Sequence, residues 1–251
     1  KKFAIKLDVI IPVFNEEEHI ASVLARVETA LLSLKASSLL EAYEILVIDD
    51  GSSDNSPQVL SALKHSKDLK IVLCETNKGK GAALQIGFQM AIGDFVIIQD
   101  ADHEYEPEDY LHLIREQKNL DADFVLGSRI LSKKNKFGFF RQKFANQLLS
   151  FLASLMLGRK ITDIETCYKL VRRDMLLLCD FNANRFDIEI EIAFELFRFK
   201  ALKFSEVAIS YNPRSYSEGK KIGWKDGVQA LVKIFSMGLR NLFLAKRVYN
   251  T

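Results

Sequence analysis

Short apolar runs alternate with amphipathic segments along the first half of the chain. Five segments rich in β-branched residues are typical of buried strands: residues 7–13, 44–48, 70–74, 94–99 and 122–127. Four segments between them place apolar residues at helical spacing: 16–34, 57–65, 82–91 and 107–118. This alternation predicts an α/β fold, a mostly parallel sheet flanked by helices.

The second half of the chain is richer in helical patterns. Helices are predicted over 137–157, 186–199 and about 224–248, with a strand over 206–211. No internal repeat or low-complexity linker separates these segments. We therefore expect one domain over residues 1–222, followed by a C-terminal amphipathic helical extension over residues 223–251.

Polar residues follow each of the five strands of the first half. The segments are Asn15-Glu16, Asp49-Asp50, Asn77–Gly81, Asp100–Glu104 and Ser128-Arg129. In parallel α/β sheets, ligands bind in the crevice beyond the carboxyl ends of the strands. Loop chemistry explains any one of these segments, but the five together indicate a single binding site.

An acidic cluster occupies residues 100–109. Asp100 and Asp102 come directly after a strand and can converge on a hard cation, with Glu104 as a further oxygen ligand. Mg²⁺ or Mn²⁺ would offset the repulsion and bind a diphosphate. The alternative is an acidic loop that caps a helix, which we apply to the remaining acids: Glu106, Glu108 and Asp109.

Two glycine-containing loops offer groups to a nucleotide. Acids of the loop 49–54 (DDGSSD) can accept hydrogen bonds from a base or a ribose, or can form a turn and a helix cap. The glycines of the loop 77–81 (NKGKG) would let the backbone approach a phosphate. Neither the P-loop nor the dinucleotide fingerprint is present, which argues against an ATPase and a nicotinamide dehydrogenase.

Composition and charge exclude further classes of function. The net charge of the 251-residue chain is +2, and no basic patch with a nucleic-acid motif occurs, so we expect no nucleic-acid partner. The three cysteines, Cys74, Cys167 and Cys179, form neither a metal-ligand pair nor a disulfide framework. No signal peptide and no apolar run of about 18–20 residues is evident, so we expect a cytoplasmic protein without a membrane-spanning helix.

Five motifs, in this order, give the chain a resemblance to a known family. They are residues 12–16 (PVFNE), 49–54 (DDGSSD), 77–81 (NKGKG), 100–102 (DAD) and 127–129 (GSR). The chain resembles the family 2 glycosyltransferases, which have the GT-A fold, a Rossmann-like architecture. Within that family it is most similar to the dolichol- or polyprenyl-phosphate sugar synthases, of the dolichol-phosphate mannose synthase type.

The resemblance implies a role for each matching position. Nucleotide-sugar binding falls to Pro12, Val13, Asn15, Glu16, Asp49, Asp50, Lys80, Gly81, Asp100, Ala101, Arg214 and Lys220. The metal, Mg²⁺ or Mn²⁺, would be bound by Asp100, Asp102 and Glu104. The synthases often have glutamine at the position of Glu104. The acceptor phosphate would be bound by Ser128, Arg129 and Lys143. The catalytic residues would be Asp102, Arg129 and Arg214. The segment 163–169 (DIETCYK) diverges from the usual Asp-Pro-Thr-Ser-Gly-Phe-Arg and receives no role.

A lid and a membrane surface complete the implied picture. Arg214 and the lysines of residues 218–221 would close over the phosphates, unless this is merely a solvated basic loop. The apolar segment 137–156, with Arg141 and Lys143 near its start, would meet a bilayer, as would the last helix. Four basic residues of that helix would adhere to an anionic leaflet: Lys225, Lys233, Arg240 and Arg247. The alternative is ordinary packing on the core or on a second subunit.

The expected function follows from these parts. The chain would transfer a sugar, with inversion and metal dependence, from a GDP- or UDP-sugar to a polyprenyl (dolichyl or undecaprenyl) monophosphate. It would act as a peripheral protein on the cytoplasmic face of a membrane. One alternative is a soluble glycosyltransferase acting on a saccharide or protein hydroxyl. Another is a catalytically silent sugar-nucleotide-binding protein.

Overall fold

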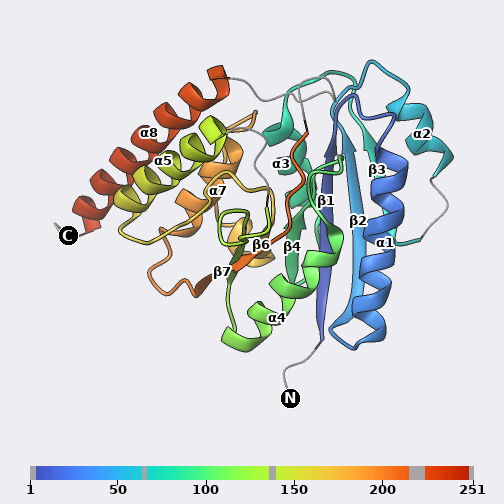
Figure 1. Ribbon diagram of the computed structural model, residues 1–251, viewed down its shortest axis with the longest axis horizontal. Helices are drawn as coiled ribbons and strands as arrows, with labels where there is room; N and C mark the ends of the chain where they lie inside the picture. The colour runs from blue at the N-terminus through green and yellow to red at the C-terminus, as the bar shows by residue number, and fades with distance from the viewer. Residues whose placement is uncertain (1–3, 64–66, 136–139, 215–223, 249–251) are drawn as a thin grey trace.

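A central sheet flanked by helices organises the chain (Figure 1). A computed structural model describes residues 4–63, 67–135, 140–214 and 224–248. Within these residues the sheet has seven strands, in the order β3-β2-β1-β4-β6-β5-β7. They are β1 (Ile5–Val13), β2 (Leu40–Asp49), β3 (Leu69–Leu73), β4 (Phe95–Ile98), β5 (Phe124–Ser128), β6 (Lys169–Arg172) and β7 (Phe204–Ala208). The predicted α/β class is confirmed.

Strand direction fixes where the polar loops meet. β1 pairs in parallel with β2 and β4, and Val13 stands opposite Asp49 at the carboxyl end of the first pair. β6 is antiparallel to both of its neighbours, β4 and β5. The amino end of β6 therefore lies at the same edge of the sheet as the carboxyl ends of the neighbouring strands. The sequence pattern did not predict β6, which is only four residues long.

The helices occupy the predicted segments, with shifted ends. They are α1 (Ile20–Ala36), α2 (Ser56–Ala62), α3 (Lys80–Met90), α4 (Tyr110–Leu120), α5 (Phe140–Leu157), α6 (Arg173–Leu176), α7 (Ile188–Leu196) and α8 (Trp224–Val248). The short α6 was not predicted. α1 begins at Ile20 rather than at residue 16, and the Glu16 carbonyl accepts the His19 and Ile20 N–H groups in the turn that precedes the helix.

The core lies on both faces of the central strands. All four residues of β4 are buried, and Leu7, Val9, Ile10 and Ile11 of β1 are fully inaccessible. Because these strands are buried on both faces, their sequences are continuous apolar runs rather than alternations of apolar and polar residues. This burial also holds the carboxyl ends of β1 and β4 rigidly at the edge where the polar loops lie.

The last helix packs on the body of the molecule with an unexpected orientation. α8 lies along α5 and α7 (Figure 1) and buries Ala230, Ile234 and Met237. Lys233 Nζ lies 2.7 Å from Glu191 Oε1, and Arg240 pairs with Glu195. Both carboxylates are buried on α7.

Two of the four basic residues of α8, Lys233 and Arg240, therefore do not face outward as expected. Lys233 and Arg240 point inward because the buried acids of α7 require counter-ions. Lys225 and Arg247 lie outside the residues whose side chains the structure describes. Within the described part of the chain, no helix is both long enough and apolar enough to cross a bilayer.

Candidate active site

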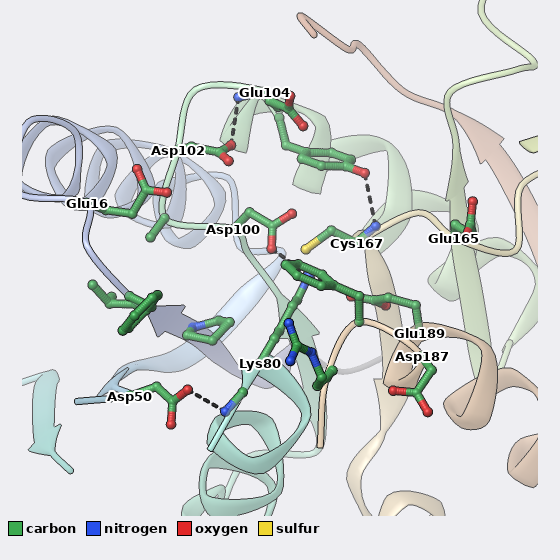
Figure 2. Close-up of a pocket in the computed structure, with 18 of the residues that line it drawn as sticks. Glu16, Asp50, Lys80, Asp100, Asp102, Glu104, Glu165, Cys167, Asp187 and Glu189 are labelled. Carbon is green, nitrogen blue, oxygen red and sulfur yellow. Dashed lines mark hydrogen bonds and ion pairs between the residues drawn. The ribbon is translucent and has the colours of Figure 1, made fainter. Parts of the chain in front are cut away.

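A cavity of about 450 Å³ opens at the carboxyl edge of the sheet (Figure 2). Its volume is typical of small-molecule sites. Residues from all five predicted strand-end segments line it. The predicted site residues that line it are Pro12, Val13, Glu16, Asp50, Lys80, Asp100, Ala101, Asp102, Glu104, Arg129 and Arg214. The structure thus brings most of the predicted site residues together.

The other predicted site residues lie behind the cavity wall or elsewhere. Asn15, Asp49, Gly81, Ser128 and Lys143 do not line the cavity. The Asn15 side chain accepts a hydrogen bond from the Ser53 N–H group, and Ser128 Oγ lies 2.6 Å from Thr162 Oγ1. Lys220 falls outside the described residues, as do Glu218 and Lys221.

Asp50 orders the loop that follows β3. Its Oδ1 accepts the Lys78 N–H group at 2.9 Å, and its Oδ2 accepts the Gly79 N–H group at 2.6 Å and the Asn77 amide at 2.9 Å. Burial, only partly offset by these bonds, raises the pKa of Asp50. Asp49 is buried as well, and it accepts the Ser52 N–H group at 3.0 Å.

The glycines of the same loop admit protein backbone. Gly81 donates its N–H group to the Asn184 carbonyl at 2.8 Å, at the start of α3. A Cβ atom at Gly79 or Gly81 would collide with the carbonyl oxygens of Asn184 and Ala183, respectively. The loop therefore needs its glycines for close contact with residues 183–184, a packing role that the sequence pattern did not indicate.

A chain of alternating charges forms the floor of the cavity. Lys80 Nζ lies 2.6 Å from Asp100 Oδ1 and 2.7 Å from Glu189 Oε1. Glu189 Oε2 in turn accepts a hydrogen bond from Lys169 Nζ at 2.6 Å. Burial acts to raise the pKa of Asp100, but the charge of Lys80 outweighs it and the pKa is lowered. Asp100 is therefore held as a carboxylate.

The environment of Asp102 disfavours the ionised form of its carboxyl group. Burial, together with the negative charges of Asp100 and Glu104, raises its pKa to about 7, although Arg214 acts in the opposite direction. Arg214 contacts Asp102 directly and lies 3.2 Å from Glu16 Oε2. Residues far apart in the sequence thus converge, and Arg214 closes one side of the cavity.

The charge balance of the cavity fits a divalent cation. Of the described lining residues, eight are acidic and five are basic, so acids exceed bases by three. Burial and the nearby charge of Asp100 disfavour the ionised form of Asp102, and a cation bound beside both carboxylates would favour that form again. Among the described residues no three side chains form a complete ligand set. Asp100 and Asp102 would therefore share a cation with oxygens of a bound diphosphate.

Glu104, the third predicted metal ligand, already has protein partners. Its Oε1 accepts the Arg214 backbone N–H group at 2.8 Å, and its Oε2 accepts the Tyr211 hydroxyl at 3.2 Å. These bonds attach the segment that follows β7 to the acidic loop. In this arrangement Glu104 positions Arg214 over Asp102.

Arg129 is fixed by a carboxylate to which we had assigned no role. Asp163 accepts hydrogen bonds from Arg129 Nε at 2.8 Å and Nη2 at 2.7 Å, and also from its backbone N–H group. Burial disfavours the guanidinium charge, but Asp163 outweighs it, so the pKa of Arg129 is raised. The guanidinium carbon also lies 5.0 Å from the centre of the Tyr211 ring. Arg129 is thus held rigidly at one end of the cavity.

Four acidic or thiol side chains in the cavity were missed by the sequence interpretation. Glu165 and Cys167 lie just before β6, while Asp187 and Glu189 lie at the start of α7 (Figure 2). A usable sequence signal existed for α7, because acids within the apolar segment 188–196 (IEIEIAFEL) require buried counter-ions. The three cysteines are free, as predicted.

Comparison with known proteins connects this geometry with a family. The profile of "Glycosyl transferase family 2" matches residues 8–177. The dolichol-phosphate mannosyltransferase of Pyrococcus furiosus is 28% identical over 263 residues, covering 95% of this chain and 70% of that protein. The undecaprenyl-phosphate 4-deoxy-4-formamido-L-arabinose transferase of Proteus mirabilis is 31% identical, over 75% of this chain and 59% of that protein. The chain therefore spans only part of the length of these relatives.

A solved structure supports the fold independently. Glucosyl-3-phosphoglycerate synthase from Mycobacterium tuberculosis, solved with Mn²⁺, UDP and glucosyl-3-phosphoglycerate, superposes with a TM-score of 0.67. The match covers 93% of this chain and 80% of that chain at 20% identity, and it shows the shared GT-A fold. Since the family profile matches well over half of the sequence, the chain belongs to glycosyltransferase family 2.

Proposed function

We propose that the protein transfers a sugar from a nucleotide-sugar donor to a polyprenyl monophosphate at a membrane surface. The observation that supports this best is the position of Arg129 and of Asn146, whose amide oxygen accepts from Arg129 Nη2 at 3.0 Å in the orientation that satisfies its neighbours. Asn146 lies on the inner side of α5, and the outer side of the same helix is apolar and exposed. A phosphate headgroup and its lipid chain would therefore find their binding surfaces within a few residues of each other.

The donor would occupy the end of the cavity near β1 and β2. Pro12, Val13 and the ordered loop at Asp50 would surround the nucleotide, and the sugar would extend toward Lys80. Asp100 and Asp102 would hold Mg²⁺ or Mn²⁺, which supplies Lewis-acid stabilisation to the departing diphosphate. Arg214 lies beside these carboxylates and adds a fixed positive charge to the leaving group.

The acceptor would supply the nucleophile. One bond breaks, between the anomeric carbon and the donor diphosphate, and one bond forms, between that carbon and an acceptor phosphate oxygen. The centre passes through an oxocarbenium-like state, and attack from the opposite face inverts it. A phosphate monoester has a second pKa of about 6, so it is largely ionised at neutral pH and needs positioning more than a strong base.

An exposed apolar surface on two adjacent helices supports action at a bilayer. We define the α5–α8 face by the large side chains exposed on these helices: Phe144, Leu148, Phe151, Leu155, Val228, Val232, Phe235 and Leu239. On each helix they recur at intervals of three or four residues. Lys233 and Arg240 point the other way, toward α7. Within the described part of α8, the charged side chains face the protein and the large apolar side chains face outward, a pattern that favours a non-aqueous partner.

Radiolabelled donor sugars test the proposal directly. With a polyprenyl monophosphate and Mg²⁺ or Mn²⁺, label should move from a GDP- or UDP-sugar into the organic phase. A chelator should abolish this transfer, and added metal should restore it, because without a cation the carboxylates of Asp100 and Asp102 repel the diphosphate. Label that appears only in water-soluble product would instead support the alternative, a saccharide or protein hydroxyl acceptor. No transfer to any acceptor would argue for a silent sugar-nucleotide-binding protein.

Charged substitutions on the α5–α8 face should weaken vesicle binding. We expect Leu155→Glu and Val232→Glu each to reduce partitioning onto anionic vesicles by about tenfold, since each removes one apolar side chain from the contact. Leu155 is 61% exposed and Val232 is 64% exposed. The assay is co-sedimentation with vesicles.

A matched control lies at the opposite edge of the sheet. Ile92 is 65% exposed and sits before β4, away from the cavity, so Ile92→Glu should leave vesicle binding unchanged. Equal losses in all three variants would contradict the assignment of the face. A shift from dimer to monomer with normal vesicle binding would indicate a second copy as its partner.

A further inference from the structure

Glu165 lies at the Arg129 end of the cavity and has no role in the function proposed so far. In the amide orientation that satisfies both neighbours, Asn146 donates to Glu165 Oε2 at 2.9 Å and accepts from Arg129 Nη2 at 3.0 Å. Glu165 lines the cavity and is half-buried. Figure 2 shows its carboxylate on the far side of Cys167 from Asp102. It therefore borders the proposed acceptor end, away from the donor carboxylates.

Charged groups of both signs surround Glu165. The charged groups that act most strongly on Glu165 are Arg129 just after β5, Asp163 in the loop before β6, Lys169 of β6 and Glu189 of α7. Two are positive and two are negative. α5 contributes the uncharged Asn146. These four charges cancel, so an ionised Glu165 adds an uncompensated negative charge to them, and that charge repels an incoming phosphate.

We infer that Glu165 controls acceptor binding through its protonation state. As a neutral carboxylic acid it donates a hydrogen bond to an oxygen of the acceptor phosphate, and as a carboxylate it repels that phosphate. Its proton comes from solvent and stays on the carboxyl group during sugar transfer. The inference rests on the proposed function, because it concerns the lipid phosphate that this function requires.

The surroundings of Glu165 make both states accessible near neutral pH. Burial, partly offset by Arg129 and reinforced by Asp163, raises its pKa to about 7. A bound phosphate raises the pKa further, so acceptor binding takes up a proton above that pH. Acceptor affinity is therefore full below about pH 7 and falls as the pH rises.

Calorimetry with a short-chain polyprenyl monophosphate and Mg²⁺ tests this linkage without requiring turnover. Between about pH 6.5 and about pH 8.5, the wild-type Kd should rise roughly twentyfold, following the loss of the protonated form. Titrations in two buffers of different ionisation enthalpy should reveal proton uptake at about pH 7.5. Glu165→Gln keeps a neutral hydrogen-bond donor, so its Kd should change less than about threefold over this range.

The conservative variant and kinetics separate the possible outcomes. Glu165→Asp keeps a titrating carboxyl group and should keep the pH dependence. The same pH dependence in wild type and Glu165→Gln would overturn the inference and leave the proposed function intact. So would a collapse of kcat at unchanged acceptor KM in Glu165→Gln, because that result indicates a general base. Failure of the wild type to bind polyprenyl phosphate at all would overturn the proposed function itself.

Discussion

Asp102→Asn should lower kcat for sugar transfer on the order of a thousandfold at saturating donor and metal. The asparagine side chain has nearly the same size, but it lacks the charge that holds a divalent cation. It also removes the carboxylate that Arg214 contacts. Both consequences weaken stabilisation of the departing diphosphate, whereas the fold should persist. The measurement is steady-state kinetics with Mg²⁺ and with Mn²⁺.

Glu108 provides the matched control for this prediction. It belongs to the same run of acids, but its side chain is 65% exposed and pairs with Arg26 at the surface. Exposed ion pairs contribute little, so Glu108→Gln should keep kcat within about twofold of wild type. Wild-type turnover in Asp102→Asn, or equal losses in both variants, would contradict the assignment of the two groups of acids.

Asp163→Ala should lower the free energy of unfolding by about 3–5 kcal/mol. The side chain of Asp163 is inaccessible and that of Arg129 is only 7% exposed, so the pair is buried. Removal of the carboxylate leaves a guanidinium group with an uncompensated charge inside the protein. The Arg129 backbone N–H group loses its acceptor as well. Urea unfolding, followed by far-UV circular dichroism, measures the change.

A double-mutant cycle distinguishes this pair from general loss of packing. The variant with both Arg129→Ala and Asp163→Ala should be more stable than the sum of the single effects predicts. The difference should be about 0.5–3 kcal/mol, because the second substitution removes the charge that the first one exposed. Strict additivity would show that the two side chains do not stabilise each other.

The location of the cavity could be predicted because parallel strands share a direction. Once the apolar runs were interpreted as parallel strands, the residues that follow them had to lie at one edge of the sheet. Glu16, Asp50, Lys80, Asp100 and Arg129 line the cavity for this reason. No knowledge of side-chain contacts was required for that step.

The opposite wall could not be predicted because one strand runs backwards. β6 has only four residues, and its first residue, Lys169, is charged although it is fully buried. The sequence of β6 therefore lacks the apolar run that is typical of a buried strand. Since β6 is antiparallel, the residues before it reach the cavity rather than the residues after it. Glu165 and Cys167 enter the site in this way, which a rule about carboxyl ends does not cover.

Individual partners were also beyond the reach of the sequence pattern. Gly81 and Asp50 belong to loops whose spacing suggests nucleotide contact, yet Gly81 bonds to Asn184 and Asp50 orders the loop of Lys78. Asn184 is about a hundred residues away in the chain, so nothing local to Gly81 indicates it. Only the folded arrangement shows which polar groups remain directed at a ligand.

The inward-facing side of α8 has a consequence for how the protein can be divided. Gln229 and Ala230 of this helix line the cavity, while Lys233 and Arg240 neutralise buried acids of α7. A fragment that ends at residue 222 would lack α8, and it would therefore lose the part of the cavity wall that Gln229 and Ala230 provide. It would also retain two buried carboxylates without these counter-ions. The same helix thus carries the exposed apolar side chains proposed to meet a bilayer and, on its inner side, part of the cavity wall.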